Sequence, residues 1–284
     1  MIAVTGASGH LGRLVIKALL AKTEASEIVA LVRNPEAVSD LAAQGVNVRK
    51  ADYDQPESYG EALEGVEKLL LISGSAVGQR VPQHKAVIEA AKANGVKFMA
   101  YTSILRADQS PMLLAEEHAA TEALLNSSSI PHALLRNGWY NENYSENLAP
   151  VLETGAVIGC SGEGRVASAS RADYAEAAAV VLTSSVEEQA GKIYELAGDE
   201  SFTMSAFAAK VATLSGKKTA YMDMSKEDYI AALTGAGVPE GFAQVLADSS
   251  ANAAGGWLED NSKTLSALIG RPTTTIAESI KAAL

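Results

Sequence analysis

The 284-residue chain has a single cysteine, Cys160, so no disulfide bond can form within it. This scarcity is typical of proteins in a reducing compartment. The chain also lacks an apolar run approaching the roughly 18 residues that a membrane-spanning helix needs. No basic leader precedes a long apolar region, so we expect no secretory signal. Together these absences predict a cytoplasmic protein with no membrane partner.

Positive charge is scarce as well. The chain has 23 lysines and arginines against 34 acidic residues, a formal net charge of -11. Such a balance disfavours nucleic acid or an anionic membrane as the main partner. A phosphate-bearing small molecule is still compatible with it, because local dipoles and one or two cations suffice to hold a phosphate group.

The first half of the chain contains a regular alternation of short apolar segments and helical patterns. We expect helices over residues 79–94 and 113–126, with an earlier one after the first strand. Strands are expected at residues 2–5, 28–32, 46–49, 68–72, 96–102 and 131–136. The strands are continuous apolar runs, which is how strands buried on both faces look. This pattern predicts an α/β fold with a doubly wound parallel Rossmann sheet.

The pattern changes after residue 137. Short strands are expected at 156–160, 165–169, 192–196 and 218–222, with helices over 171–183 and 203–214. Ser225 and Thr275 each precede an acidic residue by three positions, which predicts the start of a helix. We therefore expect a Rossmann domain over 1–136, joined by about 165–196, and a smaller C-terminal α/β lobe over most of 137–284.

The segment after the first strand carries the pattern G-x-x-G-x-x-G, with glycines at Gly6, Gly9 and Gly12. Gly6 permits a tight turn, Gly9 lets a pyrophosphate approach the backbone, and Gly12 allows close packing of helix and strand. The following helix offers free N–H groups and a positive dipole end to an anion. Because this loop joins a strand to an amphipathic helix in a βαβ unit, we expect it to bind a dinucleotide.

Arg33 stands at the end of the second strand, 21 positions after Gly12. An acidic residue near this place binds the ribose hydroxyls of NAD, whereas an arginine matches the 2′-phosphate of NADP. A solvated arginine at a strand end is the alternative. We interpret Arg33 as a 2′-phosphate ligand, which makes NADPH the expected cofactor.

Other cofactor contacts are expected where parallel strands end, because ligands of doubly wound sheets lie beyond the carboxyl ends of the strands. Each of these positions has ordinary loop chemistry as its alternative. They are Asp52, Ser73, Gly74, Ser75, Thr102, Asn137, Gly138, Trp139 and Tyr140.

Five segments together resemble the NmrA-like atypical short-chain dehydrogenases/reductases, over nearly the whole chain. They are residues 4–12, 31–35, 100–103, 134–140 and 170–174. The likeness is strongest to bacterial NADPH-dependent quinone reductases of this family, with dye reductases as relatives. The resemblance implies a Rossmann domain with a small C-terminal lobe and the cofactor in the cleft between them. It further implies NADPH contacts from the loop after residue 137 and from Gly6, Ala7, Ser8, Gly9, His10, Leu11, Arg33, Ser73, Gly74, Ser75 and Arg171.

The chain lacks the Tyr-x-x-x-Lys pair with which typical short-chain dehydrogenases donate a proton. On the helix after the fifth strand the two positions fall on Leu114 and His118. A quinone accepts hydride readily and its reduced anion can take a proton from water, so the protein supplies mainly orientation. The absent pair fits quinone reduction, and equally fits a protein that does no catalysis.

Few other residues suggest chemistry. His118 and Glu122 are four apart on a helix, but no third ligand has suitable spacing, so we expect no metal site. We interpret His118 as a helix-surface histidine, with proton donation as the alternative. Cys160 lies in a short apolar strand and reads as a small core residue.

The sequence therefore predicts direct hydride transfer from NADPH to a quinone-type acceptor. Tyr140 and Asn143 are candidates for lining the quinone site, with simple packing as the alternative. Trp257 is expected to pack in the core, with a cover over the cleft as the alternative. Two other functions stay open: a non-catalytic redox sensor that binds NADP(H), and a reductase of another electron-poor substrate such as a dye. The sequence also leaves a homodimer open.

Overall fold

The computed structural model describes residues 1–284 in full, and the chain divides into two compact units. The first unit comprises Met1–Ala107, Glu117–Asn137 and Arg171–Tyr194. The second comprises Asp108–Glu116, Gly138–Ser170 and Glu195–Leu284. None of the helices has the length and apolar character needed to cross a membrane. The predicted Rossmann domain, residues 1–136 joined by about 165–196, likewise includes a later segment of the chain. These predicted domain limits stay a prediction.

A seven-stranded sheet forms the framework of the first unit, with strand order β3-β2-β1-β4-β5-β6-β9. Its strands are β1 (Ile2–Val4), β2 (Ile28–Val32), β3 (Asn47–Lys50), β4 (Lys68–Leu71), β5 (Phe98–Ile104), β6 (His132–Asn137) and β9 (Ile193–Leu196). Neighbouring strands from β3 through β6 pair in parallel. The strand order reverses between β1 and β4, which is the switch point where such sheets bind ligands. The predicted α/β doubly wound fold is confirmed.

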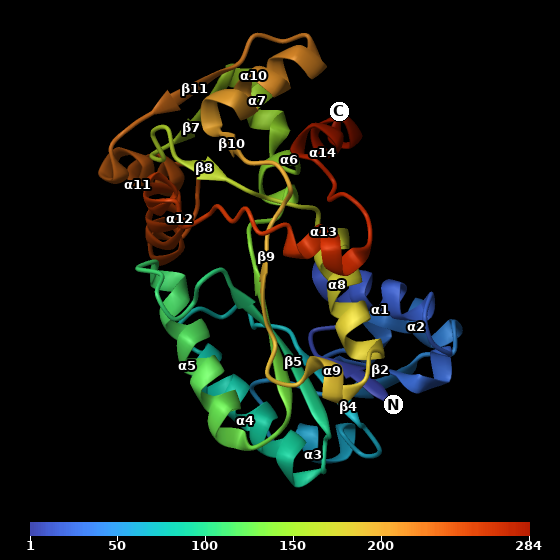
Figure 1. The fold of residues 1–284 in the computed structure, drawn as a ribbon. Helices are drawn as coiled ribbons and strands as arrows, with labels where there is room; N and C mark the ends of the chain where they lie inside the picture. Colours follow the sequence, from blue (N-terminus) through green and yellow to red (C-terminus); the bar gives the residue numbers. More distant parts are fainter. The chain divides into compact units, whose positions relative to one another are not determined.

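Helices cover both faces of this sheet because its strands are apolar on both sides (Figure 1). One face is covered by α1 (His10–Leu20) and α8 (Arg171–Thr183), which contact each other along their length. The other face is covered by α3 (Ser58–Ala62), α4 (Arg80–Ala93) and α5 (Leu113–Ser128). Short elements complete the unit: α2 (Ser39–Ala43), α9 (Val186–Gln189) and the 3-10 turns η1 (Ala25–Glu27) and η2 (Pro35–Val38).

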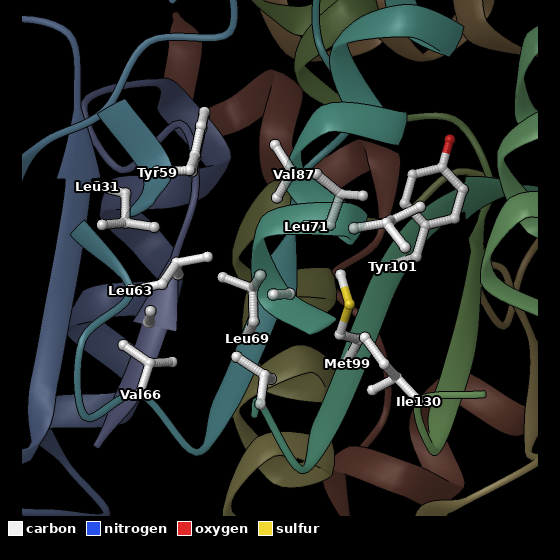
Figure 2. Packing of buried hydrophobic residues seen from close by; sticks show 14 of the residues in the cluster. Leu31, Tyr59, Leu63, Val66, Leu69, Leu71, Val87, Met99, Tyr101 and Ile130 are labelled. Carbon is white, nitrogen blue, oxygen red and sulfur yellow. The ribbon is translucent and has the colours of Figure 1, made fainter. Parts of the chain in front are cut away.

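The core beneath α3, α4 and α5 is built from alternate residues of neighbouring strands (Figure 2). Leu69 and Leu71 of β4 and Met99 and Tyr101 of β5 point into it, as the two-residue period of a strand requires. Leu69, Leu71 and Met99 are fully buried, and each such side chain stabilises the fold by about 1.5–3 kcal/mol. This packing fixes the strand ends from which the candidate site residues project.

The second unit holds two small sheets. β7 (Ala156–Gly159) pairs in parallel with β11 (Ala220–Asp223), and β8 (Arg165–Val166) pairs antiparallel with β10 (Phe202–Thr203). Its helices are α6 (Glu142–Ser145), α7 (Leu148–Thr154), α10 (Met204–Ser215), α11 (Lys226–Gly235), α12 (Glu240–Asn252), α13 (Thr264–Ile269) and α14 (Ile276–Ala283), with the turn η3 (Ala253–Gly255). The strands around residues 161–164 thus pair with distant strands and not with each other. The predicted helix starts at Ser225 and Thr275 are confirmed, since both side chains cap their helices.

Candidate functional site

The glycine loop has the geometry that its sequence predicts. Gly6 adopts a φ of +58°, a conformation that disfavours side chains. A Cβ on Gly12 would lie 2.3 Å from the carbonyl oxygen of Gly6, so only glycine fits where α1 crosses the turn. A Cβ on Gly9 would lie 3.2 Å from that same oxygen. Gly9 and Gly12 therefore pack closely against the backbone of Gly6, and this packing holds the start of α1 against the end of β1.

The start of α1 is open to a ligand. Ser8, Gly9 and His10 are exposed, while Ala7, Leu11 and Gly12 are buried and fix the backbone beneath them. The first N–H groups of a helix have no partner within it and carry a partial positive charge. No acidic residue stands in the first turn of α1 to compete for them. The loop is thus a backbone cradle of the kind that binds a pyrophosphate.

Arg33 directly follows β2 at the same edge of the sheet and is exposed. Asn34 begins the η2 turn by accepting a hydrogen bond from the N–H of Glu36 at 3.1 Å. Arg13 of α1 pairs with Asp40 at 2.8 Å, and this pairing holds the pKa of Asp40 below its usual value. The contact of Arg33 with a 2′-phosphate stays a prediction.

Residues Asp52, Ser73, Gly74, Ser75 and Thr102 also lie at the carboxyl ends of their strands. Asp52 follows β3 and is half-buried, and its backbone forms a short bridge with Gln55. The buried hydroxyl of Thr102 accepts the N–H of Ser73 at 2.9 Å. The first unit thus gathers these residues, the glycine loop and Arg33 along one edge of its sheet.

Asn137, the last residue of β6, carries an unsatisfied polar atom. Its side chain is 6% exposed, and its Oδ1 is buried with no hydrogen-bond partner. A buried acceptor left unpaired is costly, and native proteins seldom tolerate it. An amide N–H₂ group, such as that of a nicotinamide, would satisfy it. This orphaned oxygen and the glycine cradle are the two features that fit a dinucleotide at this edge.

The interpretation of His118 as a surface residue is wrong. His118 is 6% exposed, and its Nδ1 lies 2.8 Å from the hydroxyl of Tyr101 on β5. Burial lowers the pKa of His118 to about 3 and raises that of Tyr101. Because α5 presents this position to the sheet, a neutral imidazole packs where the sequence suggested a solvated one. His118 is therefore no reservoir of protons at neutral pH.

Glu122 is likewise buried, and its carboxylate has a structural role. Its carboxylate accepts hydrogen bonds from Arg136 of β6 and from Ser103 of β5. No group of three His, Cys, Asp or Glu side chains forms a potential metal site. Cys160 follows β7 and is half-buried, and burial raises the pKa of its thiol. A raised pKa disfavours the thiolate that a nucleophile would need.

The remaining predicted residues divide between the units. Arg171 is the first residue of α8 in the first unit and is half-buried. Gly138, Trp139, Tyr140 and Asn143 belong to the second unit. Tyr140 is half-buried and bridges to Ala169, whereas Asn143 in α6 is exposed. Trp257 is half-buried and follows η3. Contacts of all these residues with a cofactor or substrate stay predictions.

Comparison with known proteins matches this architecture. A family model described as NAD(P)H-binding matches residues 6–185. The chain belongs to this NAD(P)H-binding family. It is 55% identical to quinone oxidoreductase 2 of Escherichia coli (strain K12) over 99% of this chain and 97% of that protein. The crystal structure of that NADPH-dependent enzyme with NADPH superposes with a TM-score of 0.96, covering 99% of both chains.

Two further members of this wider group extend the range of known substrates. Triphenylmethane reductase from Citrobacter sp., solved as a complex with NADP(H), is 42% identical, with a TM-score of 0.95 and full coverage of both chains. An NAD(P)H azoreductase from Xenophilus azovorans is 28% identical over 99% of this chain and 97% of that protein. The resemblance predicted from the glycine loop and the segment 134–140 is confirmed.

Several residues of this family member were not predicted from its sequence. They form a polar network under the carboxyl end of β4, contributed by α4 and α5: Arg80, His84, Glu117 and Thr121. Their spacing matches no motif, because they meet only when two helices pack on the same face of the sheet. A buried histidine on an otherwise apolar helix face was the one available signal.

Proposed function

We propose that this chain is an NADPH-dependent quinone reductase. The observation that carries the proposal is the state of α5, where Leu114 and a buried His118 stand in place of a proton-donating tyrosine and lysine. With no such acid on α5, the acceptor must take hydride without one. A quinone meets this requirement, and the full-length identity with quinone oxidoreductase 2 supports it.

We propose binding roles for three features of the first unit. The amides at the start of α1 would hold the pyrophosphate, and Arg33 would pair with the 2′-phosphate. Asn137 Oδ1, which is buried without a hydrogen-bond partner, would accept the amide N–H₂ of a bound nicotinamide. When bound, NADPH supplies the hydride that reduces the acceptor. The chain itself binds, orients and excludes water, which are the contributions expected where the cofactor carries the chemistry.

Two buried residues of the first unit, Tyr101 and His118, bear on where the proton for the reduced quinone comes from. Tyr101 and His118 bond to each other in the core, and burial keeps the imidazole neutral and the phenol protonated. Neither group gives up a proton readily near neutral pH. The reduced quinone would then take its proton from water or from a group outside this pair, and the rate of hydride transfer is expected to depend little on the protonation of Tyr101 and His118 around neutrality.

The test is direct. The protein is mixed with NADPH and a series of simple quinones, and the absorbance of the reduced nicotinamide is followed. We expect oxidation of one NADPH for each quinone reduced. Absence of oxidation above the protein-free background across all acceptors, with NADPH still bound, would instead support a non-catalytic redox sensor.

A second class of acceptor is supported by the 42% identity with triphenylmethane reductase. Cationic triphenylmethane dyes are electron-poor carbon centres that also accept hydride without a proton donor. We propose that such dyes are alternative substrates of the same site. Competition between a dye and a quinone for turnover measures this, since one shared site requires mutual inhibition. A cytoplasmic location stays a prediction, as does a homodimer.

A further inference from the structure

The segment that joins β4 to α4, residues 73–80, is held largely by side chains, with two backbone hydrogen bonds of its own from Val77 and Gln79. The N–H of Ser73 donates to Thr102 at 2.9 Å, and the N–H of Gly78 donates to both carboxylate oxygens of Glu117 at 3.0 and 3.1 Å. The N–H of Arg80 donates to Glu117 as well. A loop fixed in this way presents its free surface in one defined position.

Gly74 is the most tightly held residue of this loop. Its N–H donates to Nε2 of His84 at 3.0 Å, and its carbonyl accepts from Nε of Arg80 at 2.6 Å. Both partners come from α4. A Cβ on Gly74 would lie 3.2 Å from Oε1 of Gln83, so the residue sits close against that helix. Gly74 is buried while Ser73 is half-buried and Ser75 exposed, which leaves the flanking serines on the open side.

The hydrogen bonds fix the protonation of His84. Since Nε2 accepts an N–H, the proton must be on Nδ1, which lies 2.9 Å from Oγ1 of Thr121. The Thr121 hydroxyl donates its hydrogen to the backbone carbonyl of Glu117 at 2.9 Å, so its oxygen is left to accept from Nδ1 of His84. His84 is completely buried, and burial lowers its pKa to about 4. The neutral ring is thus held in the one tautomer that can accept from Gly74.

We propose that His84 is a positioning residue for NADPH: by accepting the N–H of Gly74 it fixes Ser73 and Ser75 in the orientation that binds the cofactor. The inference rests on the proposed function, because it takes the loop after β4 to contact NADPH. His84 itself touches neither cofactor nor substrate. Its effect is on cofactor affinity and not on the hydride-transfer step.

Two substitutions of His84 distinguish the contribution of Nε2 from that of Nδ1. His84→Gln places an amide oxygen near the position of Nε2 and retains the acceptor for Gly74, whereas His84→Asn reaches only the position of Nδ1 and loses that acceptor. NADPH binding is titrated by nicotinamide fluorescence without any quinone present. We expect His84→Asn to raise the Kd about tenfold, as loss of one buried hydrogen bond predicts. His84→Gln is expected to stay within about threefold of the wild type.

A second pair tests the tautomer without changing the ring. Thr121→Val removes the acceptor for Nδ1–H, and Thr121→Ser retains it. We expect only the valine variant to weaken NADPH binding and to speed hydrogen exchange at the Gly74 amide. His132→Asn serves as the matched control, because His132 is the first residue of β6, at the amino-terminal end of the strand, and bonds to Ile130 and Asn126.

The outcomes divide cleanly. Wild-type affinity in both His84→Asn and Thr121→Val overturns the inference, as does equal weakening in His84→Asn and His84→Gln with a parallel fall in Tm. If His84→Asn does not fold, the Thr121 pair decides alone. Loss of quinone reduction with the binding pattern intact would count against the proposed function only. Unchanged kcat at saturating NADPH in the weakened variants supports positioning.

Discussion

The carboxylate of Glu122 and the guanidinium of Arg136 form a two-pronged ion pair inside the first unit. Nε of Arg136 donates to Oε1 at 3.0 Å, and Nη2 donates to Oε2 at 2.7 Å, with each side chain 6% exposed. The Ser103 hydroxyl donates to the same carboxylate at 2.6 Å. The pair ties α5 to the end of β6, one residue before Asn137.

Removing one partner of this pair should be strongly destabilising. Glu122→Ala leaves the buried Arg136 charge without its carboxylate, at an expected cost of about 3–5 kcal/mol. The free energy of unfolding in urea measures this. The double variant Glu122→Leu with Arg136→Met removes both charges and should cost less than Glu122→Ala alone.

The exposed pair of Lys97 and Glu67 provides the comparison. Glu67→Ala should leave the urea midpoint nearly unchanged, because solvent screens exposed ion pairs. A similar loss of stability at both sites would contradict the role that we assign to burial.

Gly12→Ala should abolish NADPH binding. The added Cβ would lie 2.3 Å from the Gly6 carbonyl oxygen and 2.7 Å from Cα of Ala7, which forces α1 away from the loop. Fluorescence titration with NADPH and circular dichroism report binding and folding separately. Gly60→Ala in α3 is the control, since nothing lies within 4 Å of its added Cβ, and it should stabilise the helix slightly. Normal NADPH affinity in Gly12→Ala would refute the cradle.

Arg33→Ala should weaken NADPH about ten- to a hundredfold, because a charge-assisted hydrogen bond contributes about 1.5–3 kcal/mol. NADH lacks the 2′-phosphate, so its Kd should stay nearly constant and serves as an internal control. The ratio of the two dissociation constants is the measurement. Equal losses for both cofactors would remove Arg33 from the 2′-phosphate site.

Stability should fall in mild acid. Burial lowers the pKa of His84 to about 4 and that of His118 to about 3, from 6.5 in the unfolded chain. The unfolded state therefore binds more protons below pH 6.5, and stability falls as pH drops from 6.5 toward 4. Each histidine should contribute about 1.5 kcal/mol of loss between pH 6.5 and 5.

Urea unfolding at pH 7 and pH 5 measures this loss. His84→Gln and His118→Gln should each make the pH dependence shallower, and the half-buried His132 gives the comparison through His132→Gln. If neither buried variant changed the difference between the two pH values, the acid sensitivity would have to come from carboxylates.

The sequence predicted best where function depends on the backbone of adjacent residues. The glycine loop, the strand β2 and the helix α8 were placed correctly, because strand length, glycine spacing and apolar runs are local properties. The NADPH preference was inferred from Arg33 and from the resemblance to NADPH-dependent reductases. His118 was misplaced, because helix α5 is apolar on several sides and its periodicity does not show which side faces the sheet.

The sequence by itself determined the dinucleotide cradle. Gly6, Gly9 and Gly12 act through their lack of side chains, and all three lie within a short stretch of the chain, so their spacing is visible in the sequence. Only the tertiary structure decided the tautomer of His84 and the pairing of Glu122 with Arg136. The residues that make these contacts lie 10 to 37 positions apart in the sequence. No local pattern records such contacts, because they arise when helices pack on a sheet whose strands come from distant parts of the chain.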